Sequence, residues 1–514
     1  MPELLYPTDQ KPCIPIRFLD RHQESLGWRD VLLHAHEIED LALPHPPAAS
    51  AALRILVTVT ARITGLDDPE MSAGEWATRR HALLKTPDGF GAEAVHDYFD
   101  QYVWDLFDSD RPFLQDPRLA HQCQERAGIN KLVFGRPEGN NLAWLSPHAD
   151  TDPQPLPSDQ ALWHLLTHHY YGAAGTCSAR TVAGHSASKA KAGPLRSTVS
   201  FHPLGRTLYE TLLAGLPKPS DQWPDSEDTC PWEEPALPDP AATPPPVTWP
   251  GRLLTGRSCH AALLIPTSDG QQVTSAYLTW GTQTALPATD PYLIHRINTH
   301  PQRPASQRYK PRSADADRAL WRDLDALLLA GDETSTVHRP DVFTTLNDLP
   351  QELRASLRVR AHGFDQDGKT MNRTWYTALT PPVWPWIQED DPSAAERLVE
   401  CRTAAEDIGA LLDTVSKKAW SAITSPPAKT QGGPAKPPRR LPAWTRNARA
   451  MYWPRAETTF WNLLDHPHLP ARAAFINDAI TTLRTVTRPV IAQHFRAAQV
   501  TVAAVAELRR HTAR

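Results

Sequence analysis

Paired cysteines and long apolar runs are both missing from this sequence of 514 residues. The six cysteines are scattered and form no Cys-x-x-Cys pair, which disfavours a zinc ribbon and a redox dithiol and favours reduced thiols. No segment approaches the roughly 18 apolar residues that a membrane helix needs, and the N-terminus holds no apolar run of secretory length. The sequence therefore predicts a soluble, cytoplasmic protein with no membrane partner.

Signatures of catalysis and metal binding are equally scarce. No His-Glu-x-x-His occurs, and the Ser-Asp-Asn and Lys-Thr-Gly motifs that accompany a Ser-x-x-Lys nucleophile are absent. The stretch GHSASK (residues 184–189) departs from a phosphate-binding loop, because Ser188 stands in place of the second glycine and Ala190 follows the lysine. We therefore expect no metal, no cofactor and no catalytic residue.

One serine in that stretch, Ser186, stays open as a nucleophile. A nucleophile elbow places its serine between a strand and a helix, and the preceding SARTV is a passable strand. The following ASKAKAGP is a poor helix, because Pro194 comes within one or two turns. A serine hydrolase using Ser186 is the competing function. The alternative is a flexible loop of small residues whose backbone N–H groups and neighbouring lysines suit a sugar-phosphate edge.

Length and periodicity predict two parts of different character. A single core rarely grows past about 250–300 residues, so two or more domains are expected. Residues 1–378 mix helical patterns such as AASAALRILVTVTARITG with strand patterns such as STVSFH and QQVTSAYLTWG. Within this part, residues 219–250 hold ten prolines, seven acids and no Lys or Arg, which predicts a solvated connection. Residues 391–514 carry three to four long amphipathic helices, bent or broken at Pro489, which predicts a bundle.

Acidic residues are missing from three windows of a chain whose formal net charge is -5. Residues 160–209, 291–314 and 429–455 contain no Asp or Glu but several Lys and Arg. The basic residues of the first window are Arg180, Lys189, Lys191, Arg196 and Arg206. Any one window is equally compatible with a solvated basic face, but three together favour localised contact with nucleic acid.

The order of several segments along the chain resembles the CasA family, the large subunit of the type I-E CRISPR surveillance complex called Cascade. These segments are IPIRFLD, HAHEIEDLA, RPFLQDP, INKLVFGRPEGNN, AGPLRSTVSFHPLGRTLYETLL, AYLTWGTQTAL and GFDQDGKT. The resemblance implies an α+β fold, with a large irregular N-terminal domain and a C-terminal four-helix bundle. It also implies that the chain is not an enzyme.

In that family the large subunit recognises the protospacer-adjacent motif of double-stranded DNA from the minor groove. It then wedges the strands apart so that guide RNA pairs with the target strand in an R-loop, and it helps to recruit the helicase-nuclease that destroys the target. The implied partners are therefore CRISPR RNA, double-stranded target DNA, the helicase-nuclease, and the backbone, guide 5′-end and small subunits of the complex. The basic window at residues 429–455 is expected to face another subunit or displaced DNA.

The resemblance also implies site residues. The groove-contacting loop falls on Ala183, Gly184, His185, Ser186, Ala187 and Ser188, next to Lys189. The wedge falls on Gln366 in a tight turn, with Asp365 and Asp367 beside it, unless Gln366 is an ordinary turn residue. The loop near the motif and the guide end nominates Lys131, Phe134, Asn140 and Asn141, with a core aromatic as the alternative for Phe134. The position of the family's lysine finger is not assigned, because the corresponding stretch near YLTWGTQ contains no lysine.

Overall fold

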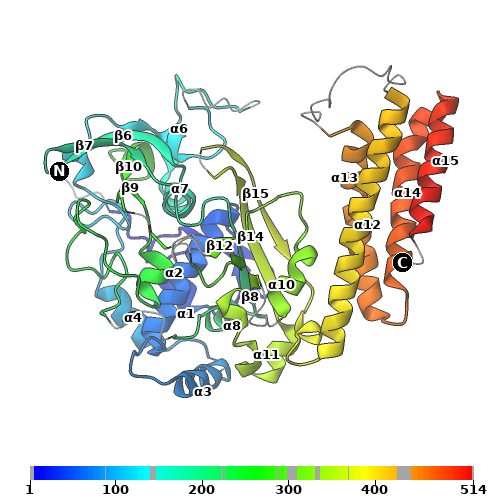
Figure 1. Ribbon diagram of the computed structural model, residues 1–514. Coiled ribbons are helices and arrows are strands. Elements are labelled where there is room, and N and C mark those ends of the chain that lie inside the picture. Colours follow the sequence, from blue (N-terminus) through cyan, green and yellow to red (C-terminus); the bar gives the residue numbers. More distant parts are fainter. Residues whose placement is uncertain are drawn as a thin grey trace. The chain divides into compact units, whose positions relative to one another are not determined.

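The computed structural model describes residues 5–86, 88–138, 146–220, 224, 226–284, 286–287, 289–297, 309–329, 336–368, 370–424 and 441–511. They form two compact units (Figure 1). The first comprises Met1–Leu320 and Ala330–Trp384, and the second comprises Trp321–Leu329 and Pro385–Arg514. The short segment Trp321–Leu329 therefore leaves the first unit and returns to it, which no feature of the sequence indicated.

Helix α2 (Pro46–Thr64) forms part of the core of the first unit. Two prolines occupy its first positions, where the missing amide costs no intrahelical bond, and Gly65 ends it with a left-handed φ of 61°. All its residues except Arg62 and Ile63 are buried, because small and apolar residues occupy nearly every face. The helix predicted from AASAALRILVTVTARITG is confirmed.

The strands of the first unit form small antiparallel sheets instead of one large sheet. One sheet has the order β2 (Gln23–Leu26), β1 (Ile14–Phe18), β3 (Ile38–Leu41), and a second has the order β4 (Ala127–Gly128), β10 (Gln272–Trp280), β5 (Leu156–Pro157), with β9 (His260–Pro266) also paired to β10. A third has the order β12 (Tyr309–Pro311), β11 (His295–Ile297), β13 (Val337–His338), and a fourth has the order β15 (Asn372–Leu379), β14 (Arg358–Gln366), β8 (Val199–Leu204). The fifth is the pair β6 (Gly175–Val182) and β7 (His185–Ala190). The strands predicted from STVSFH and QQVTSAYLTWG are confirmed as β8 and β10.

Short helices connect these sheets. They are α1 (Trp28–Leu33), α3 (Ala73–Leu84), α4 (Ala92–Asp100), α5 (Leu119–Gln122), α6 (Ile129–Leu132), α7 (Ser158–Tyr171), α8 (Leu208–Ala214), α9 (Gly251–Thr255), α11 (Gln351–Ser356) and the 3₁₀ turns η3 (Asp341–Phe343) and η4 (Leu346–Asp348). Buried charge links α2 to the segments that follow α9 and β10, because Asp290 accepts hydrogen bonds from Arg54 of α2 at 2.9 Å and from Arg257 at 2.6 Å. Such a buried pair is retained only where each charge is compensated.

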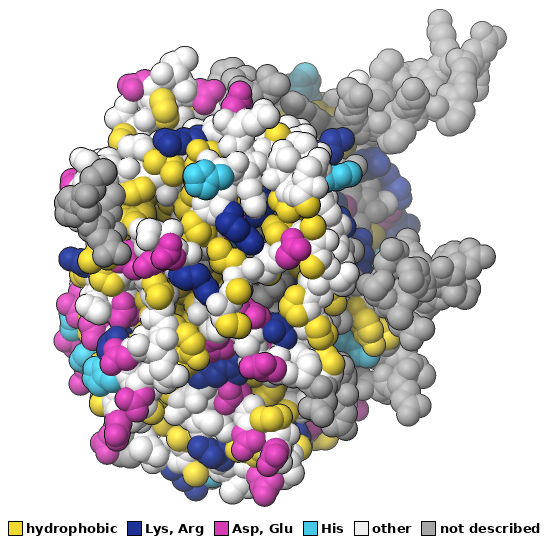
Figure 2. All heavy atoms as spheres, turned by 90° about the vertical axis from the view of Figure 1, so that its left-hand side faces the viewer, with side chains coloured by type: hydrophobic (Ala, Val, Ile, Leu, Met, Phe, Trp, Pro, Cys, Tyr) yellow, Lys and Arg dark blue, Asp and Glu magenta, His cyan; other side chains and the backbone are white. Residues whose placement is uncertain are grey.

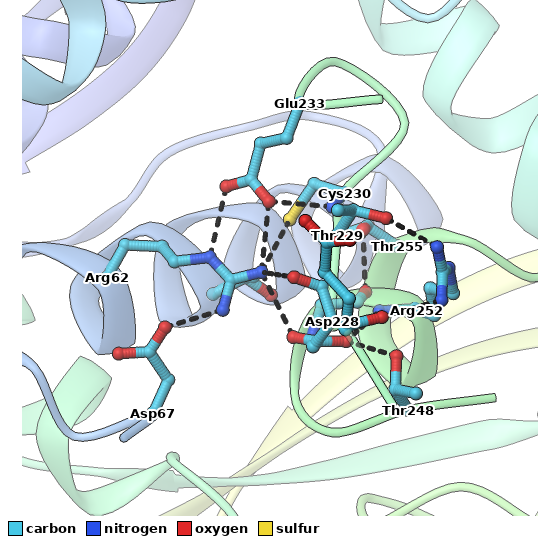
Figure 3. Close-up of polar contacts among 12 residues, drawn as sticks. Arg62, Asp67, Asp228, Thr229, Cys230, Glu233, Thr248, Arg252 and Thr255 are labelled. Atoms are coloured by element: carbon cyan, nitrogen blue, oxygen red, sulfur yellow. Dashed lines mark hydrogen bonds and ion pairs between the residues drawn. The ribbon is translucent and has the colours of Figure 1, made fainter. Parts of the chain in front are cut away.

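The Pro-rich segment, residues 226–250, is not the solvated connection that its composition predicts. Arg62 of α2 forms ion pairs with Asp228 at 3.0 Å and Glu233 at 2.9 Å, and also with Asp67 at 2.5 Å (Figure 3). Trp232 is 7% exposed and packs against the Trp104 ring at a centroid distance of 5.2 Å. The prediction was wrong because Asp228 and Glu233 pair with Arg62 on helix α2, far away in the sequence, and Glu234 pairs with Arg252 just after the segment.

The second unit is mainly helical. It contains α12 (Pro392–Thr424), α13 (Ala443–Asp465), α14 (Ala471–Ile491), α15 (Phe495–Arg510) and α10 (Leu324–Leu328), and the 3₁₀ turns η2 (Leu320–Asp323) and η5 (Trp384–Trp386) lie at its borders. Helices α12 to α15 pack side by side (Figure 1). Helix α14 runs through Pro489 and ends two residues later at Ile491, so the helices separate just after this proline and not at it. The α+β fold class with a C-terminal helical bundle is confirmed as well.

Aromatic packing explains why Trp321–Leu329 belongs to the bundle. Trp321 is 1% exposed, and its ring lies 4.7 Å from that of Phe460 on α13. Arg322 forms an ion pair with Glu406 of α12 at 2.8 Å and lies 3.5 Å from the centre of the Trp453 ring. These contacts bury Trp321 against the bundle and bind the segment to α12 and α13.

Candidate nucleic-acid interface

The stretch GHSASK is the second strand of a β-hairpin. Strands β6 and β7 pair antiparallel and are joined by Ala183 and Gly184, whose φ angles are 50° and 79°. Two consecutive positive φ angles in a two-residue connection are typical of a type I′ turn, which follows the twist of the strands. The prediction of a flexible loop is therefore wrong, because residues 185–190 form a paired strand. No nucleophile elbow forms either, because Ser186 pairs with Thr181 within the hairpin and no helix follows it.

The end of this hairpin presents small side chains to solvent. Of the seven residues nominated for groove contact, all are exposed except Ala187, which is half-buried. The turn itself carries nothing larger than the methyl group of Ala183, and a Cβ added at Gly184 would meet no atom within 4 Å. The backbone N–H groups at the tip can consequently approach a partner closely.

The hairpin is fixed to strand β10 by polar contacts. The Trp280 indole Nε1 donates to the carbonyl of Ala187 at 3.0 Å, and Thr279 Oγ1 donates to the carbonyl of Ser178 at 2.6 Å. Arg180 of β6 is buried, donates to the carbonyl of Trp280 at 3.0 Å and pairs with Asp116 at 2.6 Å. The exposed tip thus stands on a rigid base.

The acid-free window around the hairpin yields less free positive charge than its sequence suggests. Arg180 and Arg196 are buried, and Arg206 pairs with Glu210 at 2.7 Å. On the face shown in Figure 2, Lys and Arg side chains lie among Asp and Glu side chains. Lys189, which is exposed, and Lys191, which is half-buried, remain as the cations of this window that are suited to phosphate contact.

Gln366 does not lie on an exposed turn, so this expectation is wrong. It is the last residue of β14, and only 3% of it is exposed. Its side-chain Oε1 accepts from the Ser197 backbone N–H at 3.0 Å, and its Nε2 donates to the carbonyl of Tyr171 at 3.2 Å and to Asn372 at 2.7 Å. The amide faces inward because these polar partners lie beneath the hairpin of β14 and β15.

The two neighbouring acids shape the turn between β14 and β15. Asp365 is 9% exposed and forms an ion pair with Arg373 at 2.9 Å. Asp367 Oδ1 accepts from the backbone N–H groups of Thr370 at 2.6 Å and Met371 at 2.8 Å. Met371 is 59% exposed, so the turn itself, and not the nominated glutamine, faces solvent.

The nominated guide-end loop contacts this second hairpin through Phe134. Its half-buried ring lies 4.4 Å from Trp375 and 5.1 Å from Phe364, so Phe134 packs against aromatic rings of β14 and β15 without being part of the buried core. Lys131 is half-buried, with its Nζ 3.9 Å from Glu138. Asn140 and Asn141 lie outside the described residues.

The other two basic windows are only partly described. Residues 298–308 and 425–440 lie outside the described part of the chain. In the second window Arg296 and Lys310 occupy paired positions on β11 and β12 and are exposed. In the third, Arg449 forms an ion pair with Asp413 of α12.

Two of the nominated regions meet at the β14–β15 hairpin, because Phe134 packs on Trp375 of β15. The third approaches the turn only through the end of the β6–β7 hairpin away from its tip, where a Cβ built on Gly175 would lie 3.5 Å from Thr370. Arg196 also contacts the turn, and the segment AGPLRSTV was its only indication in the sequence. Among the described residues no group of three metal-ligating side chains occurs, and no helix is long and apolar enough to span a membrane.

Comparisons with known proteins agree with this architecture. The family profile of CRISPR-associated protein Cse1 matches residues 10–487. A chain of a CRISPR RNA-guided surveillance complex is 37% identical, with a TM-score of 0.83 over 98% of this chain and 99% of that one. The fold is also that of Thermus thermophilus CasA (Cse1), at 19% identity and a TM-score of 0.73 over 99% of both chains. It is shared by Thermobifida fusca Cse1 too, at 19% identity and a TM-score of 0.76 over 99% of this chain and 98% of that one.

A comparison with curated protein sequences finds no match. The family profile nevertheless covers most of the chain, and the resemblance read from the sequence is confirmed. This chain belongs to the Cse1 family, also called CasA.

Proposed function

We propose that this chain is the non-catalytic large subunit of a type I-E CRISPR RNA-guided surveillance complex. Its similarity to a chain of such a complex over nearly the full length of both supports this assignment. The hydrolase alternative loses its support, because Ser186 lies in a strand and not in an elbow. Its partners are CRISPR RNA, the other subunits, target DNA and the helicase-nuclease.

Recognition of the protospacer-adjacent motif is assigned to the tip of the β6–β7 hairpin, and this exposed tip, on a hairpin that is hydrogen-bonded to β10, is the observation that carries the proposal. The minor groove is narrow and presents mainly acceptors on its floor, so a reader needs small residues and donors. The tip offers the backbone of Ala183 and Gly184, the imidazole of His185 and the hydroxyl of Ser186. Lys189 stands beside them to contact the phosphate edge.

Strand separation is assigned to the β14–β15 turn. Asp367, Gly368, Thr370 and Met371 are its described solvent-facing residues, and Asp367 holds their backbone. A compact turn that includes an exposed apolar side chain can press on the end of a base pair and help to offset the few kcal/mol that unstacking costs. Gln366 reaches DNA only if it leaves its hydrogen bonds to Ser197 and Tyr171.

The test is binding of the reconstituted complex to duplexes with randomised flanking motifs. We expect Lys189→Ala to weaken binding to all motifs alike, by about 3- to 10-fold, and to reduce the salt slope by about 1, because one phosphate contact is lost. We expect His185→Gly to change the ranking of motifs instead. Lys85→Ala is the control, since Lys85 is exposed after α3, far from the hairpin in Figure 1.

Two outcomes would contradict the assignment. If both hairpin variants bind every motif as the wild type does, the tip does not contact DNA and the chain is a scaffold within the complex. If Lys85→Ala reduces the salt slope as much as Lys189→Ala, the effect reflects total charge and not the hairpin.

A further inference from the structure

One buried arginine connects the two hairpins. The side chain of Arg196 is 2% exposed, and its guanidinium donates to the carbonyls of Tyr171 at 3.0 Å, Asp367 at 3.1 Å and Met371 at 3.1 Å. Tyr171 ends α7 just before the β6–β7 hairpin, whereas Asp367 and Met371 flank the β14–β15 turn. The planar fork of a guanidinium suits such a multiple contact, and an ammonium group does not reproduce it.

Ser197 and the buried side chain of Gln366 form a second connection between the same two parts of the chain. Ser197 has a φ of 62°, which is uncommon for a residue with a side chain and persists only where neighbouring contacts enforce it. Its Oγ donates to the carbonyl of Gln366 at 2.6 Å, and its backbone N–H donates to the side chain of Gln366. Because Gln366 also donates to the carbonyl of Tyr171, both routes end at the same point beneath β6.

We propose that Arg196, Ser197 and Gln366 form a positioning lock that holds the β14–β15 turn in fixed register with the β6–β7 hairpin. The inference rests on the proposed function, in which the hairpin reads the motif and the turn opens the adjacent base pair. With the lock in place, docking of the hairpin on its motif sets the position of the turn. Motif binding is thereby converted into opening at one defined base pair.

The two activities are separable in this arrangement. The hairpin keeps its own anchors on β10, which are Trp280, Thr279 and the Arg180–Asp116 pair. The strands of the β14–β15 hairpin are held by the pairing of β14 with β8 and by the packing of Phe134 on Trp375. At the turn itself, the carbonyls of Asp367 and Met371 accept hydrogen bonds from Arg196. Loosening the lock is therefore expected to release the turn residues while the strands of both hairpins stay paired.

The experiment compares Arg196→Lys with Arg206→Lys in the reconstituted complex. Arg206 lies in the same acid-free window, but its side chain is 59% exposed and pairs only locally with Glu210, which makes it a matched control. Motif-dependent binding is measured on duplex DNA, and opening is followed by the fluorescence of a base analogue beside the motif. A second target carries mismatches at the first base pairs, so that opening is not required.

For Arg196→Lys we expect binding within about 3-fold of wild type. Opening of the paired target should be slowed by 10-fold or more, and a tenfold change corresponds to about 1.4 kcal/mol. The mismatched target should restore R-loop formation. Backbone hydrogen exchange should accelerate at Thr370 and Met371 but not in β7. Arg206→Lys should match the wild type in every measurement.

Other outcomes overturn the lock. Opening at the wild-type rate shows that Arg196 does not position the turn, and an equal loss on both targets shows a purely structural role. If Arg196→Lys does not assemble, Ser197→Ala takes its place, because it removes only the hydroxyl bond to Gln366; unchanged opening then refutes the lock. If the wild-type complex opens no motif-bearing duplex, the proposed function fails instead, whatever the variants do.

Discussion

Replacing Arg62 with methionine tests how the Pro-rich segment is held. Arg62 is the common partner of Asp67, Asp228 and Glu233, and it also lies 3.9 Å from the sulfur of Cys230 (Figure 3). Burial opposes the charge of Arg62, but the hydrogen bond to Glu233 and the neighbouring carboxylates raise its pKa above the ordinary value. Methionine keeps most of the volume and leaves these acids without their cation.

The expected loss follows from how little solvent reaches the cluster. The Arg62 side chain is 14% exposed, and those of its three partners are 17%, 13% and 6% exposed, so water screens them weakly. Removing one partner from a buried ion pair costs about 3–5 kcal/mol, because the remaining charge is uncompensated. With an unfolding entropy of about 0.8 kcal/mol/K for a unit of this size, the melting temperature should fall by about 4–6 °C.

Calorimetry of the purified chain measures this shift, and limited proteolysis within the Pro-rich segment reports where it originates. Arg206→Met is the control, because an exposed pair contributes at most about 1 kcal/mol. The reasoning is refuted if Arg62→Met melts within 1 °C of that control, or if the Pro-rich segment resists protease equally in both variants.

Two further predictions concern the first unit alone. Burial lowers the pKa of His164 and His362 to about 3 and that of His169 and His260 to about 4. Stability should therefore be complete above pH 6.5 and fall as the pH decreases, by about 2 kcal/mol per histidine at pH 5; a flat stability profile in urea titrations would contradict this. Gly184→Val should destabilise the turn by about 1–2 kcal/mol, because Gly184 has a positive φ that valine adopts only with strain. Ala183→Asn should not destabilise it, because asparagine tolerates a positive φ. Equal rates of backbone hydrogen exchange in β7 of the two variants would contradict this difference.

Local patterns in the sequence predicted the elements that local physics determines. The continuous apolar pattern of α2 and the long amphipathic helices of the second unit need only their own periodicity to be recognised. The segment WRDVLLHAHEIEDLAL has apolar residues at helical spacing throughout, but only Trp28–Leu33 forms a helix, whereas Ile38–Leu41 forms β3, because pairing with β1 outweighs a short helical pattern. Pairing across tens of residues is not visible in spacing.

The sequence nominated the site residues but could not predict their side-chain orientations. The small residues of GHSASK predict a surface that a partner can approach closely, while the two-residue hairpin was hidden because alanine, not asparagine or glycine, occupies the first turn position. Gln366 stands in a stretch rich in turn residues, but a register shift between Asp365 and Gln366 places its amide inside. Bulges of this kind depend on the partner strand, which the local sequence does not show.

A segment without acidic residues does not by itself predict a basic surface in the folded chain. A run of residues without acids does not remain basic after folding if acids from elsewhere pair with its arginines, as Asp116 does with Arg180. Backbone carbonyls do the same without any charge, as they do around Arg196. An acid-free segment therefore also arises where arginines must reach distant partners without competition from nearby carboxylates. In this chain the exposed positive charge on the β7 side of the hairpin is carried by Lys189, whose flexible ammonium group suits the proposed phosphate contact, while Arg180 and Arg196 are buried in contacts that hold the hairpins in place.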